Sequence, residues 1–210
     1  MKLIAITKPY CENDEAAFIR RLFESGFDIV HLRKPEADIN YCRALLEQLT
    51  EEERTKIIVH DYHILYEEFS LKGIHINKNV TALPEGYQGF KTRSCHPSAE
   101  VEMYKNHFDY VFLSPIFDSI SKAGYKSAFT EEMLKEASDK GIIDEKVVAL
   151  GGVTFDKIPY LKELNFGGAA MMGSLVGSFL LWALIFDPSA VNGQQTFSTV
   201  PEPVEGNSSA

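Results

Sequence analysis

Short apolar runs alternate with longer amphipathic segments along most of the chain. A continuous apolar run such as the one at residues 110–113 is typical of a parallel strand that is buried on both faces. The pattern predicts eight strands, at residues 2–7, 28–33, 56–60, 73–77, 89–94, 109–113, 146–150 and 169–172.

Most segments between these strands carry apolar residues at helical spacing. Asp38 and Thr130 are expected to cap the N-termini of two helices, and Gly26 is expected to end the first helix. Residues 80–88 contain Pro84 and Gly86, so a loop is expected between the fourth and fifth strands. The predicted helices span residues 15–26, 38–49, 64–71, 97–106, 130–140 and 155–164.

This alternation predicts an α/β fold with a parallel sheet, and eight units favour a compact (β/α)8 TIM barrel. The alternative is an open doubly wound sheet. A dinucleotide-binding sheet of that type needs a GxGxxG motif directly after its first strand, and this chain has none there. We expect one barrel domain over residues 1–187, in which the apolar run at 179–186 is one face of a last helix. Residues 188–210 are polar and rich in proline and glycine, which predicts a disordered tail.

Composition and charge indicate an ordinary globular protein and argue against nucleic-acid binding. The 210 residues are 45% hydrophobic and 24% charged, as in an ordinary globular protein, and the formal net charge of −9 argues against nonspecific nucleic-acid binding. Three cysteines without metal-binding spacing predict reduced thiols and a cytoplasmic location. No apolar run approaches the roughly 20 residues that a membrane span needs, so no membrane contact is expected. A homo-oligomer is compatible with the sequence, which does not determine the oligomeric state.

Three consecutive strands late in the chain end in loops suited to an anion. Hydroxyls, a lysine and glycine backbone N–H groups together are what a phosphate ester requires, and the late loops of a (β/α)8 barrel are its usual phosphate site. The chain is therefore predicted to be an enzyme acting on a small phosphorylated molecule. The residues predicted to bind phosphate in these loops are Ser119, Ser121, Lys122, Gly152, Gly173 and Ser174.

Earlier strand ends supply further candidates. His31 and Arg33 share one face of the second strand, and Arg33 would reach the end of the barrel where the active site lies. Asp61 ends the third strand and could hold Mg²⁺, or alternatively cap the next helix. Ser94 could bind phosphate or cap a helix. His75 is expected to be a packed barrel residue more often than a catalyst.

At this point the motifs resemble the thiamine-phosphate synthase family, which includes a sister branch of thiazole tautomerases. The resemblance covers residues 1–175 and rests on HLRK, VHD, GIH, the serine of RSCH, SPIFDSISK, VVALGGV and FGGAAMMGS, in that order. It implies a TIM barrel that joins an aminopyrimidine methyl diphosphate to a thiazole phosphate and releases pyrophosphate with Mg²⁺. The tautomerase branch instead moves a proton on a thiazole carboxylate phosphate.

The resemblance also implies roles for individual residues. Ser119, Ser121 and Lys122 match the family's loop for the thiazole phosphate, as do Gly152 and the turn that contains Gly173 and Ser174. The diphosphate and metal positions are matched by Arg33, Asp61 and Ser94. The catalytic candidates are Arg33, Lys122 and His31.

The departures from the family pattern lie at the diphosphate end. His31 stands where a glutamine is expected, Lys34 lies one place early, His60 replaces an asparagine, and Val80 replaces the second metal-binding aspartate. The missing aspartate predicts weakened or absent Mg²⁺ binding. Pro115 stands where the tautomerase branch has its histidine base, so His31, His60 or His75 would have to substitute there.

The predicted function is thus the synthase reaction on small thiazole and pyrimidine phosphates. The first alternative is a thiazole tautomerase. The second alternative is a catalytically silent barrel that binds thiazole phosphate or thiamine phosphate.

Overall fold

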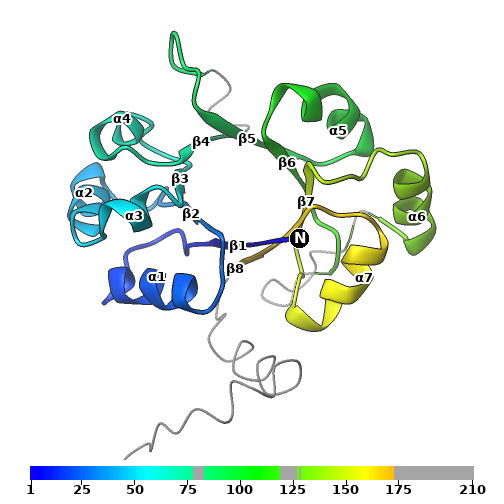
Figure 1. The fold of residues 1–210 in the computed structure, drawn as a ribbon, viewed down its shortest axis with the longest axis horizontal. Helices are drawn as coiled ribbons and strands as arrows, with labels where there is room; N and C mark the ends of the chain where they lie inside the picture. Colours follow the sequence, from blue (N-terminus) through cyan, green and yellow to red (C-terminus); the bar gives the residue numbers. More distant parts are fainter. Residues whose placement is uncertain (78–82, 119–126, 128, 173–210) are drawn as a thin grey trace, which may run out of the picture.

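Eight parallel strands close into a barrel, and the helices lie around its outside (Figure 1). The computed structural model describes residues 1–77, 83–118, 127 and 129–172. The strands follow one another in chain order, and β1 pairs with β8 to close the ring. The predicted TIM barrel is confirmed.

The predicted strands are each found within a few residues of their expected positions. Residues 77 and 83–89, the described parts of the connection between β4 and β5, contain no helix, as the proline and glycine there predict. The strands are β1 (Lys2–Ile6), β2 (Ile29–Leu32), β3 (Ile57–Val59), β4 (Gly73–Ile76), β5 (Phe90–Cys95), β6 (Tyr110–Leu113), β7 (Val147–Leu150) and β8 (Gly168–Met172).

The helices begin where the sequence supplies caps. Asp38 accepts a hydrogen bond from the Tyr41 N–H, and Thr130 accepts one from the Met133 N–H, so both predicted caps are confirmed. The helices are α1 (Glu15–Glu24), α2 (Ile39–Glu47), α3 (Glu51–Arg54), α4 (Leu65–Phe69), α5 (Ser98–Tyr104), α6 (Glu131–Asp139) and α7 (Ile158–Glu163), with 3-10 turns η1 (Lys105–His107) and η2 (Phe155–Lys157).

One short helix, α3, was not expected. Thr50 and Glu53 form a reciprocal capping box, in which each side chain accepts a hydrogen bond from the other residue's backbone N–H. This box begins a separate turn of helix directly after α2, where the sequence pattern predicts only the end of one helix.

Alternate residues of each strand face opposite sides, which creates two apolar layers. The outer layer lies between strands and helices and contains most of the buried core. The inner layer fills the barrel, so the barrel is a packed core rather than a pore. Its apolar members are Ile4, Ile6, Ile29, Ile58, Tyr110, Phe112, Val148 and Ala170.

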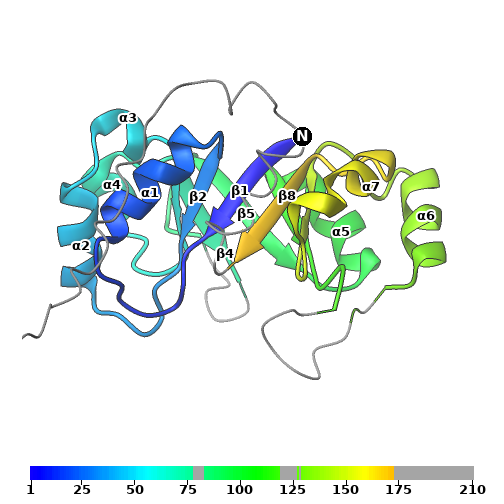
Figure 2. The ribbon, with the colours of Figure 1, turned by 90° about the horizontal axis from the view of Figure 1, so that it is seen from below.

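Figure 2 shows the barrel from the side, with the strands between the helices and the N-terminus at one end. Among the described residues, no helix combines the length and the apolar character needed to cross a bilayer. The predicted domain boundary at residue 187 and the predicted tail at 188–210 lie outside the described residues.

Candidate functional site

Arg33 directly follows β2 and is anchored through its backbone. Its N–H donates to the Thr7 hydroxyl oxygen at 3.0 Å, and the Thr7 hydroxyl donates to the Arg33 carbonyl at 3.2 Å. Because β1 and β2 are neighbours, this contact fixes the start of the loop after β2. Arg33, which is half-buried, thus lies in an anchored segment at the carboxyl end of the barrel.

Asp61 lies at the neighbouring strand end, after β3, and is tied to the same loop. Its Oδ2 accepts a hydrogen bond of 2.9 Å from the backbone N–H of Lys34. It does not cap α4, whose N-cap residue is Ile64 and has no side-chain cap. The structure therefore holds this carboxylate beside the residue that follows Arg33.

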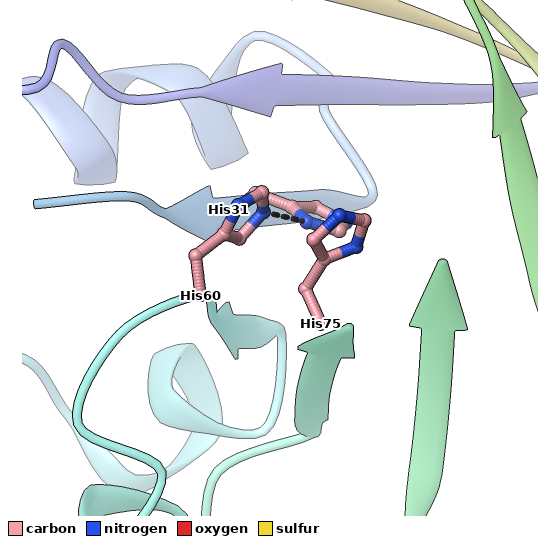
Figure 3. A group of neighbouring side chains, drawn as sticks. All are labelled: His31, His60 and His75. Carbon is pink, nitrogen blue, oxygen red and sulfur yellow. Dashed lines mark hydrogen bonds between the residues drawn. The ribbon is translucent and has the colours of Figure 1, made fainter. Parts of the chain in front are cut away.

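Three histidines lie beneath these strand ends, inside the barrel (Figure 3). His31 is in β2, His60 directly follows β3 and His75 is in β4. His31 Nδ1 shares a hydrogen bond of 2.7 Å with His60 Nε2, and the rings of His60 and His75 stack with centroids 4.0 Å apart. The sequence analysis placed His31 and Arg33 on one face, but it did not bring the three imidazoles together.

The histidines are neutral at physiological pH. Burial lowers the pKa of His75 to about 3, and it lowers the pKa values of His31 and His60 well below their usual range. The positive charge of Arg33 adds to the effect of burial on His60 and His75. The ring nitrogens of the three histidines are therefore uncharged and act as hydrogen-bond donors or acceptors towards the neighbouring side chains.

Ser94 is connected to this cluster. His75 Nδ1 lies 2.8 Å from the Thr92 hydroxyl, and His75 Nε2 lies 3.0 Å from the Ser94 hydroxyl. Ser94 does not cap α5, whose N-cap residue is Pro97. The expectation that His75 is a packed, hydrogen-bonded barrel residue agrees with this geometry.

Lys34 points away from the barrel interior and is almost fully buried between α1 and α2. Its Nζ lies 2.6 Å from Glu15 and donates to the carbonyls of Lys8 and Tyr10 at 2.9 and 2.8 Å. Glu15 also accepts a hydrogen bond of 2.7 Å from the Tyr41 hydroxyl. Lys34 therefore stabilises the connection between β1 and α1.

Gly151 and Gly152 directly follow β7 and have positive φ values of 93° and 61°. The chain after β6 runs beside them, since the N–H groups of Ile116 and Phe117 donate to the carbonyls of Leu150 and Gly151. A Cβ on Gly152 would lie 2.3 Å from the Asp118 carbonyl oxygen. Glycine is required here both by the backbone conformation and by the close approach of the neighbouring loop.

The remaining predicted phosphate ligands lie outside the described residues, namely Ser119, Ser121, Lys122, Gly173 and Ser174. Their roles stay predictions. The catalytic role of His31 also stays a prediction, and both of its ring nitrogens are engaged, by His60 and by the Tyr110 hydroxyl.

Comparisons with known proteins agree with this architecture. The thiamine-phosphate synthase of Syntrophomonas wolfei is 26% identical over 171 residues, covering 76% of this chain and 80% of that protein. A crystal structure of thiamine phosphate pyrophosphorylase from Bacteroides thetaiotaomicron superposes with a TM-score of 0.75 at 42% identity, covering 82% of this chain and 83% of that one.

A thiamine phosphate pyrophosphorylase from Pyrococcus furiosus shares the fold, with a TM-score of 0.67 at 17% identity over 88% of this chain and 94% of that one. The family model described as thiamine monophosphate synthase matches residues 3–175, which include all eight strands except the first residue of β1. The chain therefore belongs to the thiamine monophosphate synthase family.

Proposed function

We propose that this protein catalyses the synthase reaction of its family. It would join an aminopyrimidine methyl diphosphate to a thiazole phosphate, form thiamine phosphate and release pyrophosphate. In this reaction the protein is a transferase of thiamine biosynthesis that acts on small phosphorylated substrates.

The observation that carries the proposal is the position of Arg33 and Asp61 directly after the neighbouring strands β2 and β3, at the carboxyl end of the barrel. Backbone contacts hold both residues in place before any substrate arrives. One supplies a cation for a diphosphate, and the other supplies a carboxylate for a metal ion that neutralises it. The thiazole tautomerase is disfavoured because Pro115 follows β6 where that branch has its base.

Asp61 is the proposed protein ligand for Mg²⁺, and because Val80 stands where the family has its second metal-binding aspartate, the ion is expected to bind more weakly. Mg²⁺ commonly binds through one or two carboxylates and takes its other ligands from phosphate oxygens and water. One Asp61 oxygen accepts the Lys34 N–H, which orients the carboxylate. When bound, Mg²⁺ would neutralise negative charge on the diphosphate leaving group.

The side chains of the protein would bind the two substrates and position them for the reaction. Arg33 would hold the diphosphate through charge-assisted hydrogen bonds and stabilise it as it leaves. The Ser94 hydroxyl would donate a hydrogen bond to the diphosphate at the same end of the barrel. Lys122, Ser119 and Ser121 would hold the thiazole phosphate, so that the thiazole nitrogen is oriented towards the pyrimidine carbon.

An end-point assay tests the proposal directly. Purified protein is supplied with aminopyrimidine methyl diphosphate, thiazole phosphate and Mg²⁺, and thiamine phosphate is measured. Steady product formation above a heat-denatured control is expected. Binding of thiazole phosphate without any product would overturn the synthase proposal and leave the tautomerase or a silent binding protein.

Replacing Asp61 by asparagine should raise the Mg²⁺ concentration needed for half-maximal rate by at least about tenfold, or 1.4 kcal/mol. Asparagine keeps an oxygen for the Lys34 N–H but removes the negative charge. Asp28→Asn is the matched control, because Asp28 accepts a backbone hydrogen bond from Leu3 at the opposite end of β2. Equal Mg²⁺ dependence in both variants would remove Asp61 from the metal site.

Replacing Lys122 by alanine should weaken thiazole-phosphate binding by about 1.5–3 kcal/mol, the scale of a hydrogen bond to a charged group. Isothermal titration measures the affinity. Lys135→Ala, on the exposed face of α6, is the control for loss of one positive charge. Unchanged affinity in Lys122→Ala would contradict the phosphate assignment of this loop.

A further inference from the structure

The three histidines inside the barrel have the arrangement of a metal-ligand set. One ring nitrogen from each of His31, His60 and His75 lies within 4.8 Å of the others. The exposed fractions of the three residues are 0%, 5% and 1%. Figure 3 shows the rings converging from three neighbouring strands. Side chains carried by adjacent strands are held more firmly than side chains on loops.

The hydroxyls around the cluster orient its rings. His31 Nε2 is bonded to the Tyr110 hydroxyl, which leaves Nδ1 facing His60 Nε2. His75 Nδ1 is bonded to the Thr92 hydroxyl, which leaves Nε2 facing Ser94. A metal-binding histidine typically engages its second ring nitrogen in a hydrogen bond of this kind, which fixes the tautomer and the ring orientation.

The nature of the donors selects the class of metal. Three neutral imidazoles suit zinc and neighbouring transition metals, whereas Mg²⁺ requires oxygen ligands. Within the described residues, this is the one group of three or more histidine, cysteine or acidic side chains close enough together to hold an ion. Asp61 is not a member of it, so the cluster is separate from the Mg²⁺ site proposed above.

The rings must move to accept an ion. His60 and His75 now stack at 19° with centroids 4.0 Å apart, so one of these two rings has to rotate before both can point a nitrogen at the same ion. Two nitrogens that each lie about 2.0–2.1 Å from a tetrahedral zinc ion are about 3.3 Å apart. The nitrogens of His31 and His60 are now 2.7 Å apart, the distance of a hydrogen bond. Binding would replace the shared proton by the metal and separate the two rings by about 0.6 Å.

We infer that His31, His60 and His75 form a three-histidine site for a divalent transition metal of the zinc class. Three protein ligands leave a fourth coordination position for water, as in open zinc sites. The Ser94 hydroxyl is now bonded to His75 Nε2 and would have to release that nitrogen for it to bind the ion. This site does not depend on the synthase reaction and would exist in a catalytically silent barrel as well.

Metal titration of the full chain tests the inference. Protein freed of metal by a chelator is titrated with Co²⁺, whose visible absorption reports tetrahedral nitrogen coordination, and then with Zn²⁺ as competitor. One equivalent of Co²⁺ should bind, Zn²⁺ should displace it, and millimolar Mg²⁺ should not. A folded chain that binds neither Co²⁺ nor Zn²⁺ stoichiometrically would overturn the inference.

Variants assign the ligands. His75→Gln should weaken Co²⁺ binding at least about 100-fold, since loss of an outer-shell partner alone costs 10–100-fold. His107→Gln removes an exposed histidine of η1 and should leave the affinity unchanged. Unchanged Co²⁺ affinity in a folded His75→Gln variant would refute the ligand assignment.

A measurement on the unaltered chain keeps the test independent of variant folding. With ¹⁵N-labelled histidine, Zn²⁺ should shift the ring nitrogens of three buried histidines at one equivalent. Shifts confined to the exposed His96 and His107 would overturn the inference.

Discussion

Replacing Lys34 by methionine is expected to lower the free energy of unfolding by about 3–5 kcal/mol, because it leaves a buried carboxylate without its cation. Lys34 and Glu15 are each 1% exposed at their side chains and lie 2.6 Å apart. Methionine preserves most of the side-chain volume, so the lost charge accounts for the effect. Urea unfolding of the two proteins measures the difference.

Two further variants make the Lys34 prediction specific. Lys140→Met removes the cation of an exposed pair with Glu136 and should change stability far less. Lys34→Met combined with Glu15→Leu should recover most of the loss, since no unpaired charge remains and Tyr41 can still donate to the Glu12 carbonyl. A Lys34→Met effect no larger than that of Lys140→Met would show that the buried pair contributes nothing.

Replacing Gly152 by alanine is expected to cost about 2–4 kcal/mol, the sum of a left-handed backbone penalty and a steric overlap. The added Cβ would lie 2.3 Å from the Asp118 carbonyl and 2.8 Å from the Phe117 Cβ. Because the first of these atoms is backbone, the loop after β6 would have to move. Unfolding in urea measures the loss, and titration with thiazole phosphate reports whether the loop still binds it.

Gly141 provides the matched control for this substitution. Its φ of +67° is close to that of Gly152, but a Cβ there meets nothing within 4 Å. Gly141→Ala should therefore cost only the backbone penalty of about 1–2 kcal/mol. Equal losses in the two variants would show that the close approach at Gly152 has no energetic consequence.

The barrel could be predicted because strand and helix signals are local. Apolar runs, helix caps such as Asp38, and the proline and glycine after the fourth strand act within a few residues of the structure they specify. The capping box at Thr50 and Glu53 is also present in the sequence as a T-x-x-E motif. The motif directly follows another helix, so it was not interpreted as the start of a separate one. Membership of the family, the fold and the synthase reading agree with the comparisons.

The site was only partly predictable because its contacts join distant parts of the chain. Strand alternation placed His31 and Arg33 inside the barrel, and the same alternation applied to His75 would have indicated the cluster. The ion pair of Lys34 with Glu15 could not be inferred, because it depends on how α1 packs against the loop after β2. Strand parity does explain why Lys34, next to Arg33, turns outward.

The pairing of the first strand with the last has a consequence for synthesis of the chain. Lys2 lies in register with Gly168, and Ile6 lies in register with Met172. Until β8 has left the ribosome, β1 presents an open edge of unpaired backbone groups on a nascent chain. Such edges recruit other strands. The risk of aggregation during translation therefore depends on the time between synthesis of β1 and synthesis of β8. That time is set by the rate of translation and by the number of residues between the two strands, and not by the stability of the folded barrel.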